Sequence, residues 1–214
     1  MTVKIVLIDF DGTLVKRDVL DILCGVVGKK KESELLNREF HDGLRDGRSS
    51  LIKRINFLKG VTLGEIKTVL DREMYLTNGA KQLLRFLNMQ GIVSILHSGN
   101  IIQVLQYYQK ALPIRYVVGT QPQMDGDRIV GIGELDIPRN FKLQEIQKIL
   151  EILSIKPQES LAIGDSPADK KVFEYAGASI AINAKSEIEA YATYAIKDDL
   201  RNAIPIIKNL SGRQ

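Results

Sequence analysis

Two aspartates lie two residues apart directly after an apolar stretch near the start of the chain. Residues 3–8 are mostly β-branched or aliphatic, and Asp9 and Asp11 follow them, with Gly12 and Thr13 next. Residues i and i+2 of an extended chain point to the same side, so both carboxylates would leave one face of a sheet. Burying such a pair is costly unless a cation or proton offsets the charge. The motif therefore indicates a metal-dependent reaction centre or, alternatively, a surface turn built from Asp and Gly.

A second polar segment follows another apolar stretch. Residues 92–97 have the pattern of a buried strand, and His97, Ser98, Gly99 and Asn100 precede a helix expected from about Ile101. A hydroxyl and free backbone N–H groups at a helix N-terminus can bind a phosphate or an oxyanion. The alternative is that Ser98 only caps the helix. We interpret His97 as structural, because no second histidine lies near it at the spacing of a metal site.

A lysine at a predicted helix start is the third candidate. Lys142 would begin a helix over residues 143–153, where its charge opposes the helix dipole. This suggests that another group uses the ammonium, with Arg139 as a competing residue for the same role. The alternative is an ordinary surface lysine.

Two further carboxylates follow the apolar residues 160–164. Asp165 would lie at a strand end and Asp169 in the next turn. A cluster of carboxylate oxygens suits a hard cation such as Mg²⁺, with water and a substrate phosphate as further ligands.

The pattern of elements brings these segments together. Strand patterns recur at 116–119 and 179–182, and helical patterns at 80–89, 101–111, 143–153 and 170–176. This alternation predicts an α/β, Rossmann-like parallel sheet with helices on both faces. Right-handed crossovers gather the carboxyl ends of the strands at one edge, where ligands bind.

Residues 16–78 interrupt this alternation. Their apolar positions recur at helical spacing throughout, and Thr62 with Glu65 forms a capping-box pattern. We expect a small helical cap at 16–78, inserted after the first strand, and a core formed by 1–15 and 79–214. Residues 124–127 predict a β-hairpin within that core.

Composition narrows the classes of function. The 214 residues carry a formal charge of +4 without a basic run, and aromatic residues make up 6%, which does not favour nucleic acid binding. A single cysteine, Cys24, excludes an internal disulfide. No secretory signal or long apolar run is present, so we expect a cytoplasmic, soluble protein without a membrane partner. Composition carries no signal for the oligomeric state.

These motifs, in this order, resemble those of the haloacid dehalogenase superfamily of phosphatases. The matching residues are Asp-Phe-Asp-Gly-Thr-Leu-Val at 9–15, Ser98, Lys142 and Gly-Asp-Ser-Pro-Ala-Asp at 164–169. Within the superfamily the chain is most similar to the phosphoserine phosphatase family, including its C-terminal strand and helix. Ser98-Gly99-Asn100 departs from the more usual Ser-Gly-Gly of that family.

The resemblance implies a Mg²⁺-dependent phosphomonoester hydrolase with an aspartyl-phosphate intermediate. Asp9 would be the nucleophile and Asp11 the general acid and base. Mg²⁺ would bind Asp9, the Asp11 backbone carbonyl and Asp165, with Asp169 behind them. Ser98, Gly99 and Lys142 would bind the phosphoryl group, which gives Lys142 a catalytic role as well.

The resemblance also implies a small phosphorylated metabolite as substrate, with L-phosphoserine as a candidate. Asp18 would bind its ammonium and Arg54 its carboxylate, although the family usually has glutamate at the position of Asp18. The alternatives are another small phosphate, such as phosphoglycolate or a sugar phosphate, or a metal-binding regulatory protein of the same fold that lacks turnover.

Overall fold

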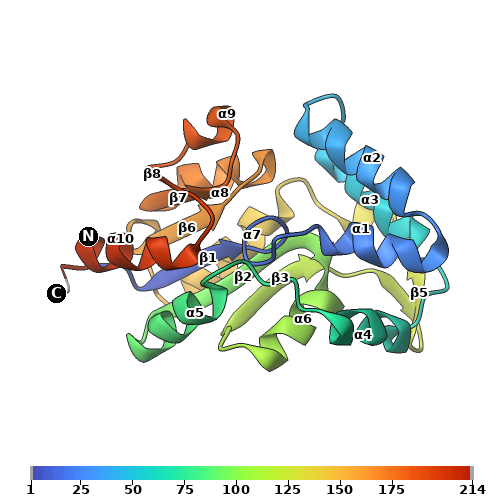
Figure 1. The fold of residues 1–214 in the computed structure, drawn as a ribbon, viewed down its shortest axis with the longest axis horizontal. Helices are drawn as coiled ribbons and strands as arrows, with labels where there is room; N and C mark the ends of the chain where they lie inside the picture. Colours follow the sequence, from blue (N-terminus) through green and yellow to red (C-terminus); the bar gives the residue numbers. More distant parts are fainter. Residues whose placement is uncertain (1, 213–214) are drawn as a thin grey trace.

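The computed structural model describes residues 2–212 and contains a six-stranded parallel sheet (Figure 1). The strand order is β3-β2-β1-β6-β7-β8. The fold class predicted from the sequence is confirmed. The strands are β1 (Ile5–Asp9), β2 (Val93–Ile101), β3 (Tyr116–Thr120), β6 (Ser160–Gly164), β7 (Ala178–Ile182) and β8 (Tyr194–Ile196).

Helices cover both faces of the sheet, because successive residues of the buried strands point to opposite faces and are apolar on both. Ile5 and Leu7 of β1 pack in one core cluster with α7, α8 and α9, whereas Val6 and Ile8 pack in another with α5, α6 and α10. The helices of the first face are α7 (Phe141–Ile152), α8 (Lys170–Tyr175) and α9 (Ser186–Glu189), and those of the second are α5 (Ala80–Met89), α6 (Ile102–Ala111) and α10 (Ala203–Leu210).

The chain between β1 and α5 is helical, as predicted, and we refer to its helices as the cap. Figure 1 shows α1, α2 and α3 grouped at one end of the molecule, with α4 beside α6. The capping box at the start of α4 is present, since the backbone N–H of Glu65 donates to Thr62 Oγ1 at 3.1 Å. The cap helices are α1 (Val19–Cys24), α2 (Lys30–His41), α3 (Gly47–Phe57) and α4 (Leu63–Arg72).

The predicted hairpin is formed by β4 (Gln123–Asp125) and β5 (Arg128–Gly131). Its second strand pairs by backbone hydrogen bonds with the connection between α3 and α4. Gly60 N–H donates to the Ile129 carbonyl at 2.8 Å, and Ile129 N–H donates to the Val61 carbonyl at 3.0 Å. The hairpin therefore lies against the cap, although the chain reaches it from the core sheet.

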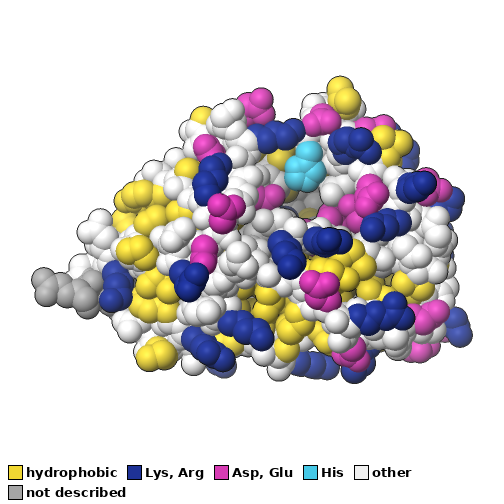
Figure 2. All heavy atoms as spheres, viewed as in Figure 1, with side chains coloured by type: hydrophobic (Ala, Val, Ile, Leu, Met, Phe, Trp, Pro, Cys, Tyr) yellow, Lys and Arg dark blue, Asp and Glu magenta, His cyan; other side chains and the backbone are white. Residues whose placement is uncertain are grey.

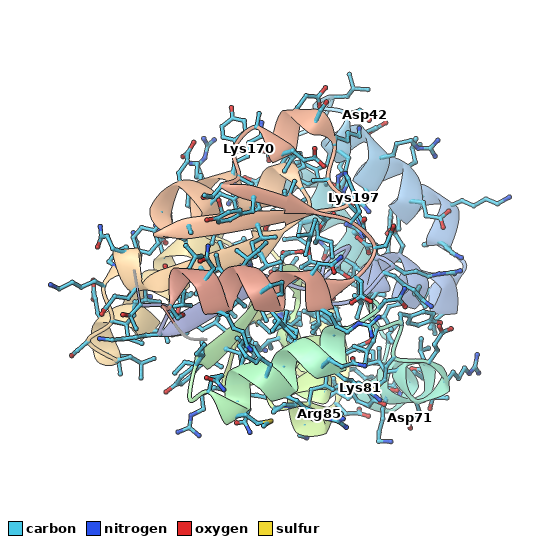
Figure 3. The ribbon with its side chains drawn as sticks, turned by 60° about the vertical axis from the view of Figure 1, so that its left-hand side comes forward. Asp42, Asp71, Lys81, Arg85, Lys170 and Lys197 are labelled. Atoms are coloured by element: carbon cyan, nitrogen blue, oxygen red, sulfur yellow. The ribbon has the colours of Figure 1, made fainter. Side chains whose placement is uncertain are left out.

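Side chains add further contacts between the cap and two later segments of the chain, which follow β5 and β7. Asn56 of α3 binds both backbone groups of Ile132, accepting at 3.1 Å and donating at 2.9 Å. At the other end of the cap, Asp42 pairs with Lys185 at 2.9 Å. Figure 3 shows Asp42 at the end of the cap near the core helices. These contacts hold the cap over the carboxyl edge of the sheet.

Two elements differ from the prediction. The strand predicted at 92–97 continues to Ile101, and α6 begins at Ile102. The three-residue β8 was not predicted as a separate strand, because so short a segment has no measurable periodicity. Among residues 2–212, no helix is long and apolar enough to cross a bilayer.

Candidate active site

The centre of the site is the contact between the end of β1 and the start of α7. Asp9 is 5% exposed, and the ammonium of Lys142 lies 2.8 Å from its Oδ1. The same ammonium lies 3.3 Å from Asp169 Oδ1. The charge that opposes the dipole of α7 thus compensates two buried carboxylates. Burial raises the pKa of Asp9, Asp169 adds to this, and Lys142 lowers it, leaving the pKa well above its ordinary value.

Asp11 lies beyond the end of β1, where three donors surround its carboxylate. It accepts from the backbone N–H of Val19 at 2.8 Å, from Ser98 Oγ at 3.0 Å and from Asn100 Nδ2 at 3.2 Å. Burial, followed by the negative charge of Asp18, raises the pKa of Asp11 to about 7. A carboxyl group with this pKa can give and take a proton near neutral pH.

The turn after β1 brings Gly12 and Thr13 against Asp165. Gly12 has φ +87°, and a Cβ at this position would lie 2.3 Å from Asp165 Oδ2, so glycine is required here on both counts. Thr13 Oγ1 donates to Asp165 Oδ1 at 2.8 Å. Burial, with the negative charge of Asp169 next, raises the pKa of Asp165 to about 8.

Asp169 is held by the loop after β6. It accepts from the backbone N–H and the hydroxyl of Ser166, both at 3.1 Å, and from the backbone N–H of Asp165 at 3.2 Å. Burial acts to raise its pKa, but the charge of Lys142 and these donors outweigh burial and lower it. Asp169 is therefore the ionised partner of Lys142.

The donor set fits a divalent cation. Asp9 is buried and Asp11 and Asp165 are partly buried. The pKa values of all three carboxyl groups are raised, so the protein alone does not compensate their charge. The space that a Cβ at Gly12 would fill also lies beside Asp165. Oxygen ligands of this kind suit Mg²⁺, which Asp9, Asp165 and the backbone carbonyl of Asp11 could hold.

This electrostatic imbalance predicts how Mg²⁺ changes thermal stability with pH. The pKa values of Asp11 and Asp165 are about 7 and 8 in the folded protein but about 3.9 in an unfolded chain. Because the folded state retains these protons, stability without metal should fall as pH rises from about 4 to about 8. Mg²⁺ binds the ionised form, so it should raise Tm by several degrees more at pH 8.5 than at pH 6, measured by calorimetry.

An Asp165→Asn variant serves as the control for this experiment. It should reduce both the loss of stability with rising pH and the effect of Mg²⁺. An equal Mg²⁺ effect at the two pH values would show that the cation binds elsewhere.

The cap contributes a buried ionic cluster centred on Arg54. Its guanidinium donates to Asp18 Oδ1 at 2.5 Å and to Asp21 Oδ1 at 3.0 Å. It also donates to Ser33 Oγ at 3.0 Å and to Asn37 Oδ1 at 3.3 Å. Burial acts to lower the pKa of Arg54, but the two carboxylates raise it above its ordinary value. Asp18 and Arg54, predicted to meet opposite charges of a substrate, thus contact each other here.

A cavity of about 620 Å³ connects the cap cluster with the end of β1. Figure 2 shows the molecule hollowed between the cap and the core, with side chains of both charges around the opening. Arg48 of α3 spans this region, donating from Nε to the Ile137 carbonyl at 2.7 Å. The predicted residues that line the cavity are Asp9, Asp11, Asp18, Arg54, Ser98, Gly99 and Lys142, and Arg139 lines it as well. Asp165 opens instead on a neighbouring cavity of about 440 Å³ beside Gly12.

Three residues of the site were missed or interpreted differently from the sequence. Asn100, noted as a departure from a family pattern, binds Asp11. Asp21 carries half of the negative charge around Arg54, and its position one helical turn after Asp18 was the available signal. His97 lies against Asp9, with its Nδ1 3.6 Å from Oδ1.

Comparison with known proteins agrees with this geometry. Residues 6–174 match the family model described as haloacid dehalogenase-like hydrolase, which covers most of the chain. The protein belongs to the haloacid dehalogenase-like hydrolase family.

The relatives give a more particular likeness. A phosphoserine phosphatase of Methanocaldococcus jannaschii is 28% identical over 207 residues, covering 96% of this chain and 98% of that protein. A phosphoserine phosphatase of Campylobacter jejuni subsp. doylei is 28% identical over 208 residues, covering 96% of this chain and all of its own length. A solved structure of a phospho-aspartyl intermediate analogue of phosphoserine phosphatase superposes with a TM-score of 0.86 at 27% identity, covering 97% of this chain and 100% of that one.

Proposed function

We propose that this protein is a Mg²⁺-dependent phosphatase that hydrolyses a small phosphomonoester through an aspartyl-phosphate on Asp9. The observation that carries the proposal is the set of carboxyl groups at the ends of β1 and β6, with Lys142 bound to Asp9 at 2.8 Å. The relatives named as phosphoserine phosphatases and the solved phospho-aspartyl analogue support it.

The first step would be displacement at phosphorus. An oxygen of Asp9 forms a bond to phosphorus while the bond from phosphorus to the alcohol oxygen breaks. Asp11, whose pKa of about 7 leaves much of it protonated at neutral pH, gives its proton to the departing alcohol. Ser98, the Gly99 backbone N–H and Lys142 would bind the phosphoryl oxygens. Mg²⁺, when bound, supplies positive charge that reduces repulsion between the carboxylate and the phosphate.

The second step would regenerate the enzyme. Asp11, now ionised, takes a proton from a water molecule that attacks phosphorus. The bond between phosphorus and Asp9 breaks, its electron pair returns to the carboxylate, and inorganic phosphate is released. Asp169 would hold Lys142 in place throughout, because it accepts a hydrogen bond from the ammonium at 3.3 Å.

For the substrate, we propose L-phosphoserine as the first candidate. An amino acid presents one charge of each sign, and the cap cluster also carries both, with Asp18 available to an ammonium and Arg54 to a carboxylate. A guanidinium has five N–H donors, and Arg54 makes hydrogen bonds from Nε, Nη1 and twice from Nη2. Within residues 2–212 one donor on Nη1 therefore has no partner, and we propose that it binds a substrate carboxylate.

The proposed arrangement assigns residues 16–78 to a cap and residues 1–15 and 79–214 to a core. In the cavity between them, the core binds the phosphate of the substrate, and the cap binds its ammonium and carboxylate groups. This division is supported by the lining of the cavity, to which the core contributes Asp9 and the cap contributes Arg54.

Phosphate release from a substrate panel tests the proposal. The panel contains L-phosphoserine, phosphoglycolate, sugar phosphates and an aryl phosphate, each assayed with Mg²⁺ and with a chelator. We expect turnover that the chelator abolishes and a preference for L-phosphoserine. Activity with a different preference would retain the chemistry and reject the assignment of Asp18 and Arg54, and no release from any member would reject the proposal.

A further inference from the structure

His97 is a buried polar side chain beside the proposed nucleophile. In the parallel pairing of β1 and β2 it lies directly opposite Asp9, so both side chains point to the face covered by α7. It is 1% exposed, and within the described part of the chain neither ring nitrogen has a hydrogen-bond partner. A buried donor or acceptor left unpaired costs free energy, so this residue calls for an explanation beyond packing.

The surroundings of His97 keep its ring neutral. Burial, followed by the positive charge of Lys142, lowers the pKa of His97 to about 3. A neutral imidazole carries one N–H donor and one acceptor. Its Nδ1 lies 3.6 Å from Asp9 Oδ1, so a small movement of the ring or the carboxylate would complete a hydrogen bond.

A metal ion between these groups is the competing explanation. Ligand atoms of Asp9, His97 and Asp169 lie within 4.8 Å of one another. However, the ammonium of Lys142 binds both carboxylates, at 2.8 and 3.3 Å. The cation of this cluster is therefore Lys142, and the imidazole is left to act as a donor.

We propose that His97 is a positioning residue that donates its Nδ1 hydrogen to Asp9 Oδ1. Together with Lys142 it holds this oxygen, so that Oδ2, which makes no hydrogen bond within residues 2–212, faces the substrate phosphorus. This role rests on the proposed function of Asp9 as nucleophile.

Donors on Oδ1 affect the two chemical steps differently. They withdraw electron density from the carboxylate, which makes Oδ2 a weaker nucleophile while improving its orientation. In the second step the bond between Oδ2 and phosphorus breaks and its electron pair returns to the carboxylate, so the same donors stabilise the departing group. Loss of the His97 donor should therefore slow hydrolysis of the intermediate more than its formation.

Two substitutions separate hydrogen bonding from packing. His97→Leu fills the space without a donor. His97→Asn retains a donor, because its side-chain amide nitrogen is bonded to Cγ, as the ring Nδ1 is. Rapid-quench measurement of the phosphoenzyme should show decay slowed about tenfold to a hundredfold in His97→Leu, with accumulation of phosphoenzyme. KM should fall together with kcat while kcat/KM changes little, because kcat/KM reports formation of the intermediate. His97→Asn should decay within a few-fold of the unaltered protein. Unchanged decay in His97→Leu, or equal defects in both variants, would overturn the proposal.

A measurement without turnover tests the contact itself. The chain has two histidines, so in a His41→Asn background the imidazole signals of the metal-free protein belong to His97. Nitrogen-15 NMR should show the tautomer protonated at Nδ1, with a chemical shift that changes in Asp9→Asn. Protonation at Nε2 would overturn the proposal. If the unaltered protein releases no phosphate from any substrate, the proposed function fails, while this spectrum still decides the hydrogen bond.

Discussion

Replacement of Asp9 by asparagine is expected to lower steady-state phosphate release by at least about three orders of magnitude. The amide cannot form an acyl phosphate at a useful rate, although its carbonyl oxygen can still accept the hydrogen bond from Lys142 that Asp9 Oδ1 accepts at 2.8 Å. The measurement is phosphate release with the best substrate of the panel in saturating Mg²⁺. Activity like that of the unaltered protein would reject the covalent mechanism.

The loss should not come from unfolding. Asp9 is a buried carboxylate whose pKa is raised by burial and by Asp169, so a neutral side chain there should leave the free energy of unfolding at pH 7 unchanged or higher. Asp125→Asn, on the exposed hairpin, is the matched control and should keep full activity. A marked fall in Tm of Asp9→Asn would leave its inactivity without mechanistic value.

The second large effect is expected for Arg54→Ala. Arg54 is 6% exposed and contacts Asp18 and Asp21, so its removal leaves two neighbouring carboxylates without a cation. We expect destabilisation of about 3–5 kcal/mol, measured by denaturant unfolding at pH 7. Adding Asp21→Asn to the same chain removes one of the charges and should recover part of the loss. Additive effects of the two substitutions would show that the cluster is not the cause.

The double variant Arg54→Ala with Asp21→Asn also tests selectivity in a more stable protein. Its kcat/KM for L-phosphoserine should fall much more than that for an aryl phosphate, because an aryl phosphate has no carboxylate for Arg54 to bind. Equal losses for both substrates would limit Arg54 to a structural role in the cap.

The elements that the sequence predicts well are those with a strong local signal. The bounds of β6 agree at both ends, because residues 160–164 form a continuous buried run that ends in Gly164 and is followed by Asp165. The capping box of Thr62 and Glu65 is equally local. By contrast, β8 has three residues and is defined by its pairing with β7, which is a long-range interaction.

The same distinction applies to the site. Strand ends predict that Asp9, Ser98 and Asp165 approach one another, since parallel strands share one carboxyl edge. The partners of these residues are not predictable in this way. From the sequence we interpret His97 as structural, because its contact with Asp9 arises only from the register of β1 and β2, which places the two residues opposite each other. The pairing of Arg54 with Asp18 depends on how α1 and α3 pack against each other. The periodicity of apolar residues within either helix does not predict this packing.

The backbone pairing between β5 and the α3–α4 connection has a practical meaning for protein engineering. The polypeptide enters and leaves the helical unit twice, once through residues 16–78 and once through the hairpin. A chimera that exchanges the helical segment alone with that of a relative would put at risk the hydrogen bonds of β5 to the α3–α4 connection and leave β5 paired only with β4. The N–H and C=O groups exposed on that edge of β5 are a known cause of aggregation. Transplanting a new specificity into this scaffold therefore requires two segments, cut in separate places and moved together.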